Sequence, residues 1–358
     1  MRYHEVFVAA AASRLPARET VADAVADGRC DARVARSTGL VSVSVANGEH
    51  PAEMAARAAA TALRASGHDP GEIDLILHAD VYYQGQDLWP PAAYVQRVAV
   101  GNRCPAVEVR QMSNGGMVAL ELAAGYLSGT GGTAALLTTG DRFAAPGFDR
   151  WRSDAGTLYA DGGTALVLSR RGGFAVLRAL ATVADSDLES MHRGDDPFGT
   201  APFSRRPRVD LDAHKRDFVA AYGLSFSLER VTAAQNEVLK QVLADAGCEL
   251  HDIDHFVLPH FGLRRLTTGY LRRWGIDAES STWPWARTVG HLGAGDQYAS
   301  LAYLAGTGRL RPGQRVLLAG VGAGFTWTLA VLDILTTPDA ATAPPPTPEP
   351  RGGQPDEH

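Results

Sequence analysis

Hydrophobic and polar positions along the chain follow two periods that alternate from one segment to the next. Apolar runs of strand length occur at residues 73–79, 133–140, 164–169, 255–259 and 315–320. Between such runs lie segments with apolar residues at helical spacing, the clearest of which are 52–66 and 232–246. The apolar run that starts near Val6 is too short for a membrane span or a secretion signal and is better read as a first strand. The alternation of helices and buried strands predicts an α/β protein.

The chain also resembles itself at a nearly constant offset. Residues 62–80 (ALRASGHDPGEIDLILHAD) match residues 242–260 (VLADAGCELHDIDHFVLPH), and each stretch predicts a helix, a glycine stop, a short loop and a strand. Further on, YLSGTG starting at Tyr126 returns as YLAGTG starting at Tyr303. We therefore expect two copies of one α/β half.

This repeat predicts the domain organisation. The two halves are residues 1–171 and residues 172–335. Residues 336–358 lack apolar anchors and are rich in Pro, Gly and acidic residues. Such a composition cannot bury enough apolar surface to order a chain, so we expect a disordered tail.

The repeat also indicates where a site would lie. Ser113 stands in QMSNGGM (residues 111–117), between an apolar run and a helical one, and the offset places it opposite the residue before His291. Asp80 and His260 form a second equivalent pair at the carboxyl ends of matching strands, where open α/β sheets bind ligands. We expect the two helix starts, one from each half, to converge on a common centre.

Several ordered motifs resemble the β-ketoacyl-acyl-carrier-protein synthase III enzymes of the thiolase superfamily, over nearly the whole chain except the tail. The motifs are IDLILHAD (73–80), the elbow at 111–116, YADGGTALVL (159–168), VLPHFGLRRL (257–266), GHLGAGDQYAS (290–300) and RLRPGQRVLLAGVGAGFTW (309–327). The resemblance implies a thiolase fold, in which two pseudo-duplicated α/β halves form five layers in the order αβαβα. It also implies a homodimer.

The chain departs from this family at the catalytic positions. Where the synthases carry cysteine, histidine and asparagine, this chain carries Ser113, His260 and His291. A cysteine thioester is a good electrophile for a carbanion, and the histidine with the asparagine stabilises the enolate made by decarboxylation. A serine ester is a poorer electrophile, and the asparagine donor is gone. Decarboxylative condensation is therefore disfavoured.

The remaining residues suit acyl transfer. A serine needs an adjacent base that a third group orients, and His291 followed by Asp296 gives the chain order Ser, His, Asp of a catalytic triad. His260 is the alternative base. The carboxylate reaches the imidazole only if LGAG forms a loop, because a continuous helix would point the two side chains apart. The family resemblance places the oxyanion hole at the backbone N–H groups of Ser113 and Ala323.

Structural roles are the alternatives for these residues. Ser113 could be a helix N-cap, His291 a core histidine bonded to backbone, and Asp296 a first-turn helix acid. His192 stands near where the family lines its acyl pocket, but it could equally be a surface residue. The family's CoA clamp has an aromatic residue before a Thr-Gly pair. This chain lacks that aromatic residue. Candidates for pantetheine or phosphate contacts, unless they are solvated surface residues, are Arg33, Arg36 and Arg265.

The pattern is similar to the serine-bearing ketosynthase III-like acyltransferases that handle a propionyl starter in daunorubicin-type polyketide pathways. The resemblance implies that a short acyl group, with propionyl favoured, passes from acyl-CoA through Ser113 to an acyl carrier protein or a ketosynthase partner. One alternative acceptor is a sugar or another natural-product hydroxyl. A second alternative is a non-catalytic specificity subunit of a ketosynthase complex. No metal or redox cofactor is implied.

Composition and motif spacing argue against several other classes of protein and of binding site. The formal net charge of −6 and the absence of a basic run argue against nucleic acid or an anionic membrane as partner. Three separated cysteines without CxxC spacing suggest neither a disulfide framework nor a zinc site, which fits a reducing cytoplasm. His251 and His255 have metal-like spacing but stand on a loop that enters a strand. GVGAGF has Phe325 in place of a third glycine, so a dinucleotide site is not expected.

Overall fold

Nine strands form one mixed sheet in the computed structural model, which describes residues 1–338. The strand order is β5-β4-β6-β7-β1-β8-β11-β10-β9. The strands are β1 (Phe7–Arg14), β4 (Ile73–Ala79), β5 (Ala106–Val109), β6 (Ala134–Asp141), β7 (Gly162–Ser169), β8 (Ala175–Ala184), β9 (His255–Val257), β10 (Arg315–Gly322) and β11 (Thr326–Ile334). A separate antiparallel pair consists of β2 (Arg18–Thr20) and β3 (Ser42–Ser44).

Eleven α-helices are present in the described part of the chain. They are α1 (Val21–Ala26), α2 (Ala32–Thr38), α3 (Pro51–Ser66), α4 (Pro91–Val95), α5 (Gly115–Thr130), α6 (Leu211–Tyr222), α7 (Leu224–Ala246), α8 (Leu263–Leu266), α9 (Arg272–Trp274), α10 (Trp283–Ala286) and α11 (Asp296–Gly306). None of the described helices is long and apolar enough to cross a membrane. The predicted tail is described only up to residue 338, so most of it lies outside the described residues.

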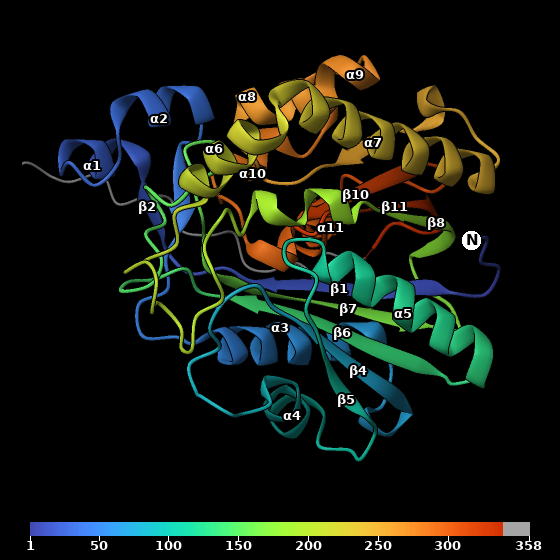
Figure 1. The fold of residues 1–358 in the computed structure, drawn as a ribbon. Coiled ribbons are helices and arrows are strands. Elements are labelled where there is room, and N and C mark those ends of the chain that lie inside the picture. The colour runs from blue at the N-terminus through green and yellow to red at the C-terminus, as the bar shows by residue number, and fades with distance from the viewer. Residues whose placement is uncertain (339–358) are drawn as a thin grey trace, which may run out of the picture.

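The sheet has the same strand order on both sides of the β1–β8 pair. Reading outward from this pair, β1-β7-β6-β4 on one side corresponds to β8-β11-β10-β9 on the other. Only two residue pairs join β1 to β8, and Figure 1 shows the two parts of the sheet as separate layers. In that view α7 covers one part, α3 covers the other, and α5 and α11 lie between them. The five-layer α/β architecture expected from the sequence is confirmed, whereas the division into two domains stays a prediction.

Successive residues of a strand pack into two different hydrophobic clusters, one on each face of the sheet. In β4, Ile76 packs in a cluster with Ala55 and Ala59 of α3, whereas Leu75 and Leu77 belong to the central cluster around α5 and α11. Side chains of a strand point alternately to the two faces of its sheet, so a strand covered on both faces is apolar throughout. This explains why the strands read as continuous apolar runs in the sequence.

Most predicted elements lie where the pattern placed them. The strand expected at 73–79 has those bounds, and the helix expected at 52–66 is Pro51–Ser66. The helix expected at 232–246 is longer, because it starts at Leu224. Both helices end at the expected glycines, Gly67 with φ 70° and Gly247 with φ 68°. Glycine adopts this left-handed conformation without steric cost, which ends the helix.

The first turns of α5 and α11 approach each other very closely. A Cβ atom on Gly116 would lie 2.4 Å from the carbonyl oxygen of Ala294. The hydroxyl of Tyr298 donates a hydrogen bond of 2.5 Å to the carbonyl oxygen of Gly116. The two helix starts that the repeat relates are thus packed against each other at the centre of the molecule.

Candidate active site

Ser113 stands on a sharp turn between β5 and α5. The residue before it, Met112, has a left-handed φ of 50°, a conformation that costs a non-glycine residue free energy and occurs often at functional sites. The helix begins at Gly115 with Asn114 at its N-cap, so Ser113 is not the cap. Its hydroxyl oxygen instead lies 2.9 Å from Nε2 of His291.

His291 in turn contacts Asp296. Nδ1 of His291 lies 2.7 Å from Oδ2 of Asp296. A single 3₁₀ turn, Gly293–Gly295, separates the two residues before α11 starts at Asp296. The chain therefore forms the loop that the contact requires, and it does not continue as one helix. The structure brings Ser113, His291 and Asp296 together in one hydrogen-bonded row.

The contacts of Asp296 favour its ionised form. Burial by itself raises the pKa of this carboxyl group, but interactions with His260 and His291 and accepted hydrogen bonds outweigh burial, so the pKa lies below its ordinary value. The backbone N–H groups of Leu292 and His260 each donate to the carboxylate at 2.8 Å. An ionised carboxylate only accepts hydrogen bonds, so the proton sits on Nδ1 of His291. Its Nε2 then carries the lone pair that faces the Ser113 hydroxyl.

The backbone and ring of His291 are held by the segment around Tyr159. The His291 N–H donates to the carbonyl of Leu158 at 3.0 Å, and the His291 carbonyl accepts from the N–H of Ala160 at 2.8 Å. The rings of Tyr159 and Phe261 pack edge-on against the imidazole, with centroids 5.0 and 5.6 Å away. The imidazole is thereby fixed in one orientation.

His260 has a different environment from the one expected of a catalytic base. Its side chain is fully buried, with Nδ1 2.9 Å from the carbonyl oxygen of Gly290 and Nε2 2.8 Å from the hydroxyl of Ser300. Burial lowers the pKa of His260. It has no hydrogen bond to Ser113, and it is absent from the lining of the cavity that holds Ser113. Its Nδ1 also lies 3.5 Å from Oδ1 of Asp296, but no contact reaches Ser113, so a direct catalytic role for His260 stays a prediction.

Ser113 and His291 open into a cavity of about 390 Å³. Ala323, whose N–H is the second predicted oxyanion donor, lines the same cavity, as does His192. Burial, followed by the charge of Lys215, lowers the pKa of His192 to about 3, so this side chain is neutral near neutral pH. Its Nδ1 has no hydrogen-bond partner among the described residues. A polar group of a bound molecule could therefore pair with it.

A buried ion cluster forms another part of the cavity wall. Arg265 donates to both oxygens of Asp154, at 2.9 and 2.7 Å, and Nζ of Lys215 lies 3.0 Å from the same carboxylate. Asp154 is only 2% exposed. Two cations face this one buried carboxylate, and the charge of Asp212 acts on both cations as well. By contrast, Arg33 and Arg36 are exposed on α2 and do not line the cavity.

Some residues of the site were not predicted from the sequence. Asp154, Lys215, Tyr159 and Phe261 all line the cavity. Tyr159 and Phe261 lie inside motifs that were recognised, next to residues that were singled out, so their position was a usable signal. Lys215 stands on a helix with polar residues on most sides, and no local pattern distinguishes it. Among the described residues, no group of three His, Cys, Asp or Glu is arranged to hold a metal ion.

The chain is similar to known proteins in both sequence and fold. Residues 243–334 match the family model described as 3-oxoacyl-[acyl-carrier-protein (ACP)] synthase III C terminal. The chain is 27% identical over 291 residues to the β-ketoacyl-[acyl-carrier-protein] synthase III of Neisseria meningitidis serogroup C, covering 80% of this chain and 85% of that protein. It is also 27% identical over 314 residues to the same synthase of Rhizorhabdus wittichii.

Solved structures extend the comparison to the whole fold. The structure named as the acyltransferase ChlB3 is 35% identical, covers 94% of this chain and 99% of its own, and superposes with a TM-score of 0.90. The 3-oxoacyl-[acyl-carrier-protein] synthase III of Aquifex aeolicus, at 20% identity, covers 92% of this chain and 99% of its own with a TM-score of 0.74, and shows the same fold. The chain therefore belongs to the β-ketoacyl-acyl-carrier-protein synthase III-like enzymes of the thiolase superfamily.

Proposed function

We propose that this protein is an acyltransferase that carries a short acyl group on Ser113 and hands it to an acceptor without decarboxylative condensation. The observation that carries the proposal is the row Ser113–His291–Asp296, with contacts of 2.9 and 2.7 Å. A serine with an oriented imidazole and a buried carboxylate is the arrangement that activates a hydroxyl for attack on a carbonyl. The likeness to ChlB3, which is named as an acyltransferase, also supports acyl transfer.

The first half-reaction uses this row directly. Nε2 of His291 takes the hydroxyl proton as Oγ of Ser113 attacks the thioester carbonyl carbon. The negative charge that develops on the carbonyl oxygen would be held by the backbone N–H groups of Ser113 and Ala323, and one such donor is typically worth about 3 kcal/mol. The carbon–sulfur bond then breaks, and the thiolate takes the proton from His291.

The second half-reaction repeats these steps with the acceptor. His291 removes the proton from a thiol or hydroxyl of the acceptor, which attacks the Ser113 ester. The ester bond to Ser113 breaks, and the serine oxygen recovers the proton from His291. Asp296 stabilises the imidazolium in both half-reactions. The reaction so written needs no metal and no redox cofactor.

The favoured donor is a short acyl-CoA, propionyl-CoA first, and the favoured acceptor is an acyl carrier protein or a ketosynthase partner in polyketide biosynthesis. The cavity of about 390 Å³ leaves room for a thioester arm beside a short acyl group. A sugar or another natural-product hydroxyl would use the same two half-reactions. The homodimer and the cytoplasmic setting expected from the family remain predictions.

Intact-mass measurement after incubation with propionyl-CoA tests the proposal. We expect one propionyl group on the wild-type protein and none on Ser113→Ala. The matched control is Ser128→Ala, which removes a hydroxyl from the far end of α5 and should leave the adduct intact. An unmodified wild-type protein, or an adduct that survives Ser113→Ala, would rule the mechanism out.

Adding an acceptor to the acylated protein then separates the alternatives. Loss of the adduct to a carrier protein supports the favoured acceptor, and loss only to a hydroxyl compound supports the sugar alternative. A protein that never becomes acylated by any thioester would fit the non-catalytic specificity subunit.

A further inference from the structure

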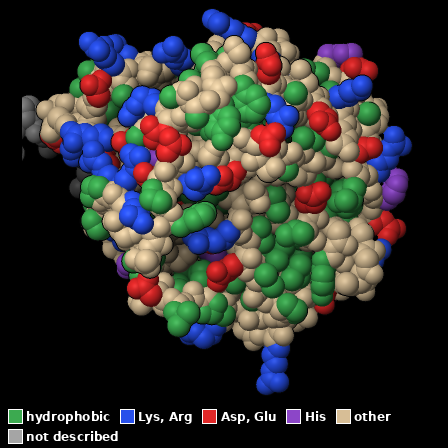
Figure 2. Space-filling model, viewed as in Figure 1, with side chains coloured by type: hydrophobic (Ala, Val, Ile, Leu, Met, Phe, Trp, Pro, Cys, Tyr) green, Lys and Arg blue, Asp and Glu red, His purple; other side chains and the backbone are tan. Residues whose placement is uncertain are grey.

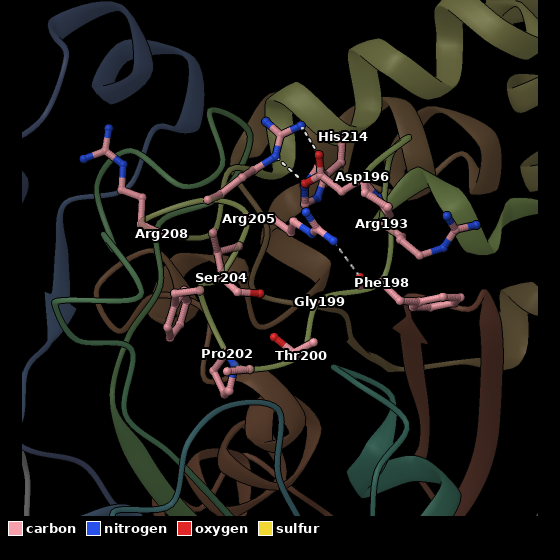
Figure 3. Close-up of a pocket in the computed structure, with 15 residues that line it drawn as sticks. Arg193, Asp196, Phe198, Gly199, Thr200, Pro202, Ser204, Arg205, Arg208 and His214 are labelled. Atoms are coloured by element: carbon pink, nitrogen blue, oxygen red, sulfur yellow. Dashed lines mark hydrogen bonds and ion pairs between the residues drawn. The ribbon is translucent and has the colours of Figure 1, made fainter.

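A surface groove lies next to the Ser113 cavity and has no part in the proposed reaction. Its volume is about 570 Å³, and residues of the segment 193–209 line it together with His214. Figure 3 shows Arg208 and Phe198 on opposite sides of this groove, with Arg205 between them. The lining of the groove combines exposed aromatic rings with several arginines.

The groove and the cavity share a thin wall. His192 and Lys215 line the Ser113 cavity, whereas their chain neighbours Arg193 and His214 line the groove. Nδ1 of His214 lies 2.8 Å from the carbonyl oxygen of His192, a contact that joins the two parts of the wall. A molecule held in the groove is therefore beside the reaction site but does not touch Ser113.

The lining of the groove is rich in arginine, although the chain as a whole is acidic. The whole chain has a net charge of −6, yet the groove lining has one carboxylate and four arginines: Asp196, Arg193, Arg205, Arg206 and Arg208. Arg206 pairs with Asp196, Arg193 pairs with Glu189, and Arg208 pairs with Asp149. Arg205 donates only to the carbonyl of Phe198, at 3.1 Å, and no described carboxylate lies within ion-pairing distance of it. On the face shown in Figure 2, Lys and Arg side chains gather at the upper left, around α1 and α2.

Apolar side chains beside these arginines are unusually exposed. Phe198 is 90% exposed and Phe203 is 46% exposed at the groove. Leu228, which lines the mouth of the Ser113 cavity, is 57% exposed. The centres of protein–protein interfaces are enriched in aromatic residues and arginine and depleted in lysine, and no lysine lines this groove.

We propose that this groove is the docking surface for an acidic carrier protein that presents its acyl group on a long flexible arm. The inference rests on the proposed function, since it names the partner that loads or unloads Ser113. The wall keeps a docked body away from Ser113, so only a partner with an extended arm can sit in the groove and reach the cavity past Leu228. The unpaired charge of Arg205 selects an acidic surface, and Phe198 and Phe203 supply apolar contact area.

The double variant Arg205→Glu/Arg208→Glu tests the docking surface. We would measure the rate of Ser113 acylation from two donors of the same acyl group, an acyl carrier protein and an acyl N-acetylcysteamine thioester. The second donor has no protein body, so it also reports whether the variant is folded. The control is Arg64→Glu on α3, which makes one such charge reversal on a helix that covers the other part of the sheet.

Reversing two charges at an interface mainly slows association, so we expect kcat/KM for the carrier to fall about tenfold or more. The rate with the small thioester should be unchanged, and the Arg64→Glu variant should behave as the wild type with both donors. Equal rates for variant and wild type with the carrier would overturn the docking surface, as would an equal loss with both donors. A selective loss of transfer to a hydroxyl acceptor would make the groove an acceptor site instead. If no donor acylates Ser113 in the wild type, the proposed function fails, not this surface alone.

Discussion

Nδ1 of His291 lies 2.7 Å from Oδ2 of Asp296, five positions further along the chain. On an α-helix, residues at this spacing point to different sides. The contact exists because Gly293, with φ 64°, turns the chain back before α11 begins. A Cβ atom on Gly293 would lie 2.4 Å from Oδ2 of Asp141. The glycine is therefore required both by its backbone conformation and by the space that Asp141 occupies.

Replacing Asp296 with asparagine should nearly abolish acyl transfer. An amide in this place can donate a hydrogen bond to Nδ1 of His291, which would move the ring proton to Nε2 and remove the base that faces Ser113. Loss of the correct tautomer in such a triad costs a rate factor of about a thousand or more. The rate of Ser113 acylation by propionyl-CoA measures the effect. A thermal unfolding curve checks the fold, and a folded Asp296→Asn variant with an undiminished rate would contradict the triad.

Replacing Ser113 with cysteine should give an acylated protein that still does not condense. The Nδ1 proton of His291 points to Asp296, so the ring has no N–H left to stabilise an enolate. His260 points to Gly290 and Ser300. We therefore expect a thioester adduct on Ser113→Cys but no β-ketoacyl product when a malonyl thioester is added. Product analysis by mass spectrometry checks this, and efficient condensation would show that a donor for the enolate is present after all.

The strands, the longer helices and the glycine stops could be predicted because their signals are local. A strand covered on both faces is apolar throughout. A glycine that adopts positive φ marks the residue at which a helix ends. The repeat then placed Ser113 opposite Gly290, the residue before His291, without any knowledge of contacts. These features depend on residues that are close in the sequence, or on a comparison of the chain with itself.

The parts that could not be predicted depend on contacts between distant segments. Asp154 pairs with Arg265 across 111 positions, and nothing near either residue indicates the other. The orientation of His260 is set by Ser300 and Gly290, so a correct position in the sequence did not fix the direction of its ring. The start of α7 at Leu224 was missed, although Leu224, Leu228 and Val231 recur at helical spacing. Arg33 and Arg36 were chosen by analogy to a clamp whose aromatic residue is absent.

Acid should destabilise the protein through His78, which is remote from the reaction. Burial lowers the pKa of this fully buried side chain to about 4, from 6.5. Below pH 6.5 the unfolded chain binds a proton that the folded protein does not bind until about pH 4. The neutral His78 side chain thus contributes fully to the stability of the fold above pH 6.5. This contribution is lost as the pH falls to about 4, which lowers the free energy of unfolding by about 3 kcal/mol.

Urea unfolding of the wild type and of His78→Asn, near pH 7.5 and near pH 5, measures this loss. Asparagine can still hydrogen-bond near Thr138 and Gln84 but does not titrate. The wild type should lose about 2 kcal/mol more than the variant between the two pH values. The comparison uses the change in the free energy of unfolding between the two pH values, so a lower absolute stability of the variant does not affect it. Equal changes would mean that other groups determine the acid sensitivity.

Replacing Gly116 with alanine should separate the two helix starts and inactivate the protein. The added Cβ atom would lie 2.4 Å from the backbone carbonyl oxygen of Ala294, and backbone cannot move aside as a flexible side chain can. The turn that leads to Asp296 would shift, and a displacement of about 1 Å between reacting groups can cost a hundredfold in rate. Gly125→Ala on the same helix is the matched control, because nothing lies within 4 Å of its added Cβ atom. That variant should keep full acylation and gain up to about 1 kcal/mol of stability, since alanine favours a helix over glycine. If both variants acylate at the wild-type rate, the close approach of α5 to the Ala294 turn does not position Ser113.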